Sequence, residues 1–124
     1  LAFGPTGLSN HVDHIAMHHA TLEAFNRYRA SSGREPTLYF WAIPQHVVEV
    51  FDLDIDGAEV EPHIFMDVAE TWYAKIQSLR MYASQQDAQD IAAMMEDFPE
   101  KYELFHQVYP PLPAGAIFND LFHD

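Results

Sequence analysis

The spacing of apolar positions near the N-terminus predicts one long helix behind a turn. Over residues 12–25, apolar side chains recur every three or four positions, which is the repeat of a helix with one buried face. Asn10 is a favourable N-cap, and Asp13 at the third helical position would complete a capping box. We expect this helix to run to about Ala30, with Gly33 ending it.

Two apolar stretches on either side of that helix predict strands. Residues 1–3 lead into a Gly-Pro-Thr-Gly turn, and residues 37–43 form an unbroken apolar run that ends at Pro44. A run that is apolar at every position is typical of a strand buried on both faces, as in a parallel sheet covered by helices. The order strand, helix, strand corresponds to a βαβ unit, so we expect an α/β fold with a parallel sheet.

The rest of the chain predicts a mixture of helices and strands. Two amphipathic helices are expected, and their inward side chains are read from the helical repeat. The first is expected to bury Ala69, Trp72, Tyr73, Ile76, Leu79 and Ala83, and the second Ile91, Ala92 and Met95. The expected elements are a short helix over 45–51, a strand over 58–66, a helix capped by Asp67 with Glu70, a helix from Asp87 to before Pro99, an edge strand over 102–109 and an extended proline-rich tail.

Composition and charge exclude several classes of protein. Nineteen acidic and six basic residues give a formal net charge of −13, which disfavours binding to nucleic acid or to an anionic membrane. The absence of cysteine excludes disulfides, thiolate zinc sites and cysteine nucleophiles. No apolar run is long enough to span a membrane and none resembles a signal peptide, so we expect a cytoplasmic protein. At 124 residues the chain is expected to be one α/β domain, or part of one that continues upstream of Leu1.

The most suggestive chemistry lies at the start of the predicted helix, in the run from His11 to His14 with His18 one turn further on. His11 and His14 are three residues apart and share a helix face. One imidazole can bind a metal while the other handles charge beside a carboxylate. For His18 we favour packing or a pocket wall over ligation. The remaining histidines are expected to be structural or solvent-facing: His19, His46, His63, His106 and His123.

An acidic segment offers a different interpretation. Residues 52–57 read Asp-Leu-Asp-Ile-Asp-Gly, which resembles the first half of a calcium-binding EF-hand loop. In that loop the twelfth position would be His63 instead of glutamate, and the eighth would be Glu59 instead of an apolar residue. We therefore interpret the segment as an acidic turn, with a calcium-binding module as the weaker hypothesis.

Residues 4–22 resemble the second motif of the LmbE-like, or PIG-L-like, N-acetylglucosamine deacetylases. In that family a strand and a glycine-rich turn lead into His-Pro-Asp-His at the start of a helix, where this chain has His-Val-Asp-His. The likeness continues downstream, through residues 38–44, 75–85, 105–110 and 120–122. It implies the C-terminal portion of a Rossmann-like, parallel-sheet enzyme: a zinc-dependent hydrolase that removes the acetyl group of an amino-sugar conjugate.

The resemblance also implies a role for each matching residue. His14 would bind zinc or another divalent metal, and His11 would stabilise the oxyanion as an imidazolium. Asp13 would orient His11 and keep it charged, while Gln85 could border the substrate. The family's His-Pro-Asp-Asp motif, which holds two further metal ligands and the general base, does not occur in these 124 residues. We therefore expect a fragment that binds zinc weakly or not at all unless an N-terminal half completes it.

A hypothesis from another class remains open. The chain would be a non-catalytic remnant or assembly module that keeps the α/β shell without the chemistry. The strand predicted over residues 37–43 could then expose an edge to a partner chain, either an N-terminal half or a second copy in a homo-oligomer.

Overall fold

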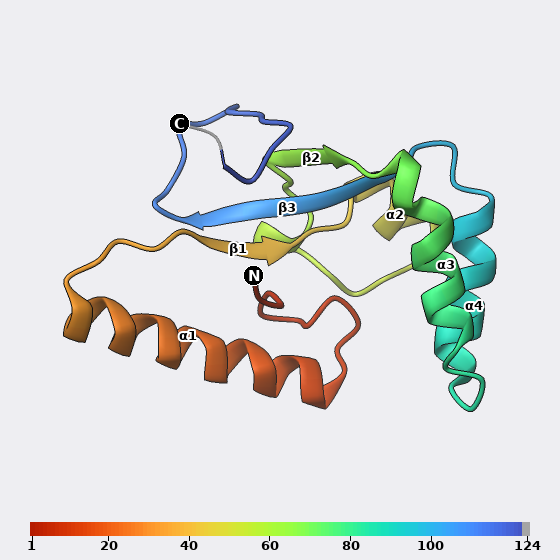
Figure 1. The fold of residues 1–124 in the computed structure, drawn as a ribbon, viewed down its shortest axis with the longest axis horizontal. Coiled ribbons are helices and arrows are strands. Elements are labelled where there is room, and N and C mark those ends of the chain that lie inside the picture. The colour runs from red at the N-terminus through yellow and green to blue at the C-terminus, as the bar shows by residue number, and fades with distance from the viewer. Residues whose placement is uncertain (123–124) are drawn as a thin grey trace. The chain divides into compact units, whose positions relative to one another are not determined.

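The computed structural model describes residues 1–122 as a mixed α/β fold, which confirms the expected class at this level (Figure 1). The described chain divides into two compact units. One comprises Leu1–Phe65 and the segment that begins at Leu104, and the other is Met66–Glu103. None of the helices in the described part is both long and apolar enough to cross a membrane. In chain order the elements are α1 Val12–Ser32, β1 Leu38–Trp41, α2 Gln45–Val50, η1 Gly57–Glu59, β2 Ile64–Asp67, η2 Ala69–Thr71, α3 Trp72–Arg80, α4 Gln86–Glu96 and β3 Tyr102–Tyr109.

The long N-terminal helix is present as α1, but its cap differs from the prediction. His11 is the N-cap, and its Nδ1 accepts a hydrogen bond from the Asp13 amide at 3.2 Å. Asn10, the predicted cap, instead adopts a left-handed backbone conformation with φ of 56°. Its side-chain amide donates to the carbonyl of Asp54 at 2.9 Å. The prediction was wrong by one residue because a distant carbonyl satisfies the asparagine, leaving the imidazole to cap the helix.

The sheet contains three strands in the order β1–β3–β2, and the expected parallel pairing was wrong. β1 and β3 run antiparallel, with Leu38 opposite Tyr109 and Trp41 opposite Phe105. An apolar run reports burial on both faces and carries no signal for the direction of the neighbouring strand. Parallel pairing among the described residues is confined to two isolated bridges, Ala2 with Phe40 and Ile64 with Phe118.

β3 was expected at the edge of the sheet, and it lies in the centre. The His63 amide donates to the Phe105 carbonyl at 2.8 Å, while the Val68 amide donates to the Lys101 carbonyl at 2.9 Å. Residue numbers rise from 63 to 68 on the β2 side while their partners fall from 105 to 101 on the β3 side, so β2 and β3 are antiparallel. The centre of the sheet is thus β3, the last strand among residues 1–122, which is placed there by contacts far apart in sequence.

Both faces of β1 are covered, as its uniform apolar character predicts. Leu38 and Phe40 pack with Ala2 on one side, where Leu22 and Phe25 of α1 reach them. Figure 1 shows α1 running alongside β1 in this unit. Tyr39 points to the opposite face because successive strand residues alternate, and its hydroxyl donates to the Leu121 carbonyl. The C-terminal segment therefore contacts β1 through the Tyr39 side chain.

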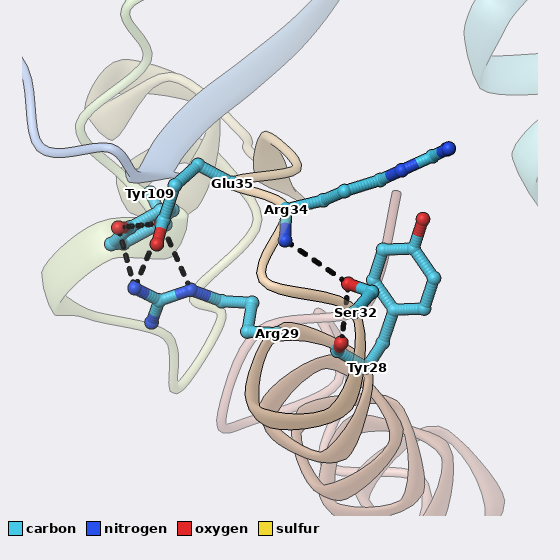
Figure 2. A network of polar contacts seen from close by, with 6 residues as sticks. All are labelled: Tyr28, Arg29, Ser32, Arg34, Glu35 and Tyr109. Carbon is cyan, nitrogen blue, oxygen red and sulfur yellow. Dashed lines mark hydrogen bonds and ion pairs between the residues drawn. The ribbon is translucent and has the colours of Figure 1, made fainter.

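A polar cluster fastens the C-terminal end of α1 to the end of β3 (Figure 2). Arg29 donates through Nη2 to Glu35 at 2.8 Å, and its guanidinium lies 3.8 Å from the centre of the Tyr109 ring. The Tyr109 hydroxyl donates to the same carboxylate. This hydrogen bond, with help from Arg29, holds the pKa of Glu35 below its ordinary value, and the same bond raises the pKa of Tyr109. Gly33 ends the helix next to the cluster with φ of 64°.

The second unit is an α3–α4 pair with its own apolar core. Trp72 and Ile76 of α3 pack against Ala92 and Met95 of α4, and the Trp72 indole donates to the Met95 carbonyl at 3.0 Å. Each of these residues was predicted to face inward. The hydrogen bond satisfies the indole N–H inside an otherwise apolar cluster.

The helix cap and several inward positions of this unit were predicted wrongly. Asp67 accepts from the Ala69 amide at 2.9 Å, at the start of the short η2 turn, while the N-cap of α3 is Thr71. Tyr73 is 71% exposed and Ile91 is 43% exposed, although both were expected to be buried. Ala69 and Ala83, expected to face inward as well, are also exposed. The η2 turn shifts the start of the helix, and the helical repeat over-counts inward positions on a helix that packs through a narrow stripe.

Candidate functional site

A tight turn over residues 4–10 precedes α1 and shapes the candidate site. The Gly7 amide donates to the Gly4 carbonyl at 3.0 Å, and the Asn10 amide donates to the Thr6 carbonyl at 2.8 Å. Gly7 has φ of 63°, and a Cβ there would lie 2.5 Å from the Cβ of His14. Only glycine lets the turn approach the start of α1 so closely.

His14 is held by that approach. Its Nδ1 lies 2.9 Å from the Gly7 carbonyl oxygen, and its ring stacks on Phe3 with centroids 4.1 Å apart and planes 8° apart. The Gly7 carbonyl can only accept, so this hydrogen bond requires the proton on Nδ1 and leaves the lone pair of the neutral ring on Nε2. The Ser9 hydroxyl lies farther from the same Nδ1, at 3.4 Å. The ring is therefore fixed in position, orientation and tautomer.

His11 lies beside His14, with ring centroids 5.1 Å apart. Its Nδ1 accepts from the Asp13 amide, so in the neutral ring the proton sits on Nε2. The Asp13 carboxylate, 83% exposed, lies 4.0 Å from His11 Nδ1 and is outside hydrogen-bond reach. The spacing brings the three predicted residues together, but a backbone amide orients His11 in this structure. The orienting role of Asp13 stays a prediction.

His18 is part of the core. It is buried, its Nδ1 lies 2.9 Å from the Phe3 carbonyl, and its ring meets Phe40 edge to face at 5.2 Å. This is the packing role favoured from the sequence. His19 lies edge-on to His18 at 5.2 Å and is exposed.

The side chain of Glu59, a buried carboxylate, binds the turn, and this contact was not predicted from the sequence. Glu59 has no exposed surface, and its Oε2 accepts from the Thr6 amide at 2.8 Å and from the Thr6 hydroxyl at 2.7 Å. Its Oε1 accepts from the Leu8 amide at 3.0 Å. No local signal marks this residue, which is one of nineteen acidic side chains and lies 53 positions from Thr6. Three donors to one carboxylate explain how it remains buried.

A second pair of histidines lies on the sheet. The rings of His63 and His106 are 4.2 Å apart. His63 Nδ1 accepts from the Gln107 amide at 3.2 Å, and His106 Nδ1 lies 2.7 Å from the Glu61 carbonyl. Burial lowers the pKa of His63, and the neighbouring His106 lowers it further against the opposing effect of Glu61.

A catalytic zinc site needs three protein ligands and an open position. His14 Nε2 fits one ligand, because the opposite nitrogen is held by a backbone carbonyl. Residues 1–122 hold no group of three or more histidine, aspartate or glutamate side chains placed to share an ion. Within residues 1–122, His14 is therefore a candidate for one ligand of such a site.

Two sequence predictions lie elsewhere. Gln85 is the exposed N-cap residue of α4 in the second unit, and its backbone N–H donates to the Tyr82 carbonyl at 2.9 Å. Its proposed contact with substrate stays a prediction. His123 lies outside the described residues.

Comparison with protein families, with curated proteins and with solved structures finds no match to this chain. The resemblance to the LmbE-like deacetylases therefore rests on the residues quoted above.

Proposed function

We propose that this chain contributes half of the active site of a zinc-dependent N-deacetylase acting on an N-acetylated amino-sugar conjugate. The observation that carries the proposal is the state of His14. Its Nδ1 is held by the Gly7 carbonyl at 2.9 Å and its ring rests on Phe3, so Nε2 is the nitrogen with a free lone pair. Histidines that bind metals typically donate their other N–H to a backbone carbonyl or carboxylate in this way.

His11 supports the same chemistry. Attack on an amide places negative charge on the carbonyl oxygen, and a donor fixed next to the metal ligand would stabilise that charge. Because His11 Nδ1 accepts from the Asp13 amide, Nε2–H is available to donate to the oxyanion. A zinc ion held by His14 would supply a Lewis acid for the carbonyl.

A separate polypeptide, or an N-terminal half, with a His-Pro-Asp-Asp motif would complete the proposed site. That motif would provide two further metal ligands and the general base. That polypeptide is the partner we propose, together with an amino-sugar substrate that the resemblance suggests. We also propose a cytoplasmic location, since the chain has no cysteine.

The test uses the protein purified from its own cells with every polypeptide that accompanies it. We expect His14→Ala to lose bound zinc, measured by elemental mass spectrometry. His11→Ala should keep zinc and lose roughly 10²–10³-fold in the rate of acetate release from N-acetylglucosamine conjugates, because an oxyanion donor is removed. His19→Ala, an exposed histidine of the same helix, is the matched control and should keep both.

Equal zinc content and equal activity in the unchanged protein and in His14→Ala would contradict the proposal. A 14.2 kDa chain that purifies alone, without zinc and self-associated, would instead support the non-catalytic assembly module.

A further inference from the structure

We infer that Glu59 is a positioning residue for His14, acting through the backbone of the turn that holds the imidazole. The inference rests on the proposed function for its catalytic meaning. Its structural content, that a buried carboxylate sets the tautomer of a distant histidine, can be measured separately.

The turn binds both oxygens of the Glu59 carboxylate. Glu59 accepts three hydrogen bonds, from the amide and hydroxyl of Thr6 and from the amide of Leu8. It has no exposed surface, so water does not compete for these donors. A buried carboxylate with three donors is held firmly, because losing any of them would leave charge unsatisfied.

A single peptide group, between Gly7 and Leu8, connects the carboxylate of Glu59 to the imidazole of His14. The Leu8 N–H and the Gly7 C=O belong to the same planar, trans peptide unit, so they point in opposite directions. Glu59 Oε1 binds the N–H side at 3.0 Å, and His14 Nδ1 binds the carbonyl side at 2.9 Å. Fixing one side of the plane therefore fixes the direction of the other. The carboxylate selects the Nδ1–H tautomer of His14 and leaves Nε2 free.

The Glu59 side chain occupies the space that a Cβ on residue 4 would need. A Cβ on Gly4 would lie 2.2 Å from Glu59 Cγ and 2.4 Å from Cδ. Glycine at this position is thus required for the glutamate side chain to enter the turn. The two glycines of the turn have separate tasks, since Gly4 admits Glu59 and Gly7 admits His14.

The experiment records imidazole ¹⁵N spectra of the metal-free chain at about pH 8.5, where ordinary histidines are neutral. In the unchanged chain we expect the Nδ1–H tautomer of His14 to dominate. In Glu59→Gln an amide donor faces backbone donors, so that tautomer should lose its dominance and the Leu8 amide signal should shift. The signals of β1 and β3 should stay in place, which separates repositioning from general unfolding.

Glu61→Gln is the matched control, because it removes the same charge from an exposed side chain two residues away. It should leave the His14 tautomer unchanged. A folded Glu59→Gln chain with an unchanged His14 tautomer would overturn the inference.

If Glu59→Gln does not fold, Thr6→Val replaces it. This change removes only the hydroxyl donor, and the Nδ1–H population should fall in the same direction by less; an unchanged population would again overturn the inference. Because no zinc is present, these outcomes are independent of whether the assembled protein deacetylates a substrate.

Discussion

At the scale of single residues, the role of each histidine follows from what its ring nitrogens contact. His14 donates through Nδ1 to a carbonyl and keeps a lone pair on Nε2. His63 accepts at Nδ1 from a backbone amide, so protonating that nitrogen would break the contact. His18 is buried against Phe40 and supports the core. One residue type therefore provides a candidate ligand, a group sensitive to protons and a structural side chain.

His63 should make the stability of the first unit depend on pH. Burial and the neighbouring His106 hold the pKa of His63 below its ordinary value, while Glu61 opposes this. The unfolded chain then binds more protons than the folded chain as the pH falls below about 6.5, so folding stability is lost on acidification. We expect the urea midpoint, followed by circular dichroism, to fall between about pH 7.5 and pH 5.5.

His63→Asn is the informative variant, because its side-chain oxygen can still accept from the Gln107 amide but does not titrate. It should show a smaller loss of stability over the same pH range. His46→Asn is the control for removing a histidine from an exposed helix position, and it should follow the unchanged chain. Identical pH profiles for His63→Asn and the unchanged chain would refute the assignment.

At this scale the sequence predicted local relations and missed distant ones. The three-residue spacing placed His11 and His14 together correctly, because helix geometry relates residues over one turn. Glu59 could not be predicted, since its donors at Thr6 and Leu8 lie 53 and 51 positions away. Only the folded backbone brings that carboxylate into the turn.

At the scale of elements, periodicity predicted most helices and strands but not all of their neighbours. The uniform apolar run gave β1 and its burial on both faces. It could not reveal the antiparallel partner, which follows 60 or more residues later along the chain. The caps of α1 and α3 were also missed, because Asn10 bonds to Asp54 and a short turn intervenes after Asp67. Competing contacts, which sequence spacing does not encode, decide such positions.

The α3–α4 pair gives a direct test of which inward positions matter. Ile76 is 4% exposed within the Trp72 cluster, whereas Ile91 is 43% exposed. Truncating a buried isoleucine removes apolar contacts and leaves a cavity, so Ile76→Ala should destabilise this unit by about 2–5 kcal/mol. Ile91→Ala should change its stability by only about 0.5 kcal/mol.

Amide hydrogen exchange in α3 and α4 measures both effects within the same unit. Protection should drop steeply in Ile76→Ala and stay close to the unchanged chain in Ile91→Ala. Equal losses in the two variants would contradict the conclusion that the buried Ile76 contributes more to the stability of this unit than the exposed Ile91.

At the scale of the whole molecule, we expect the surplus of negative charge to oppose folding more than the ion pairs support it. The chain has a formal net charge of −13, and four ion pairs between a carboxylate and a lysine or arginine are found among residues 1–122. Most of these pairs are substantially exposed, and exposed pairs contribute little each. Self-repulsion among the surplus carboxylates extends over roughly 30 Å at 0.01 M salt but only about 10 Å at 0.1 M. Salt therefore reduces the long-range repulsion between carboxylates more than it reduces the attraction within the close ion pairs.

We expect the Tm measured by circular dichroism to rise as sodium chloride increases from about 0.01 M to 0.15 M, where screening acts before salting-out does. The acidic turn supplies a matched pair of variants. Asp54→Asn with Asp56→Asn removes two exposed charges, so it should raise the Tm at low salt and lose that advantage at the higher salt. Glu23→Gln also removes a charge but breaks the exposed pair with Arg27, so its gain should be smaller. A Tm that falls with salt would show that the ion pairs outweigh the repulsion. In that case the surplus of acid would reflect solubility or cation binding, with no cost to the fold.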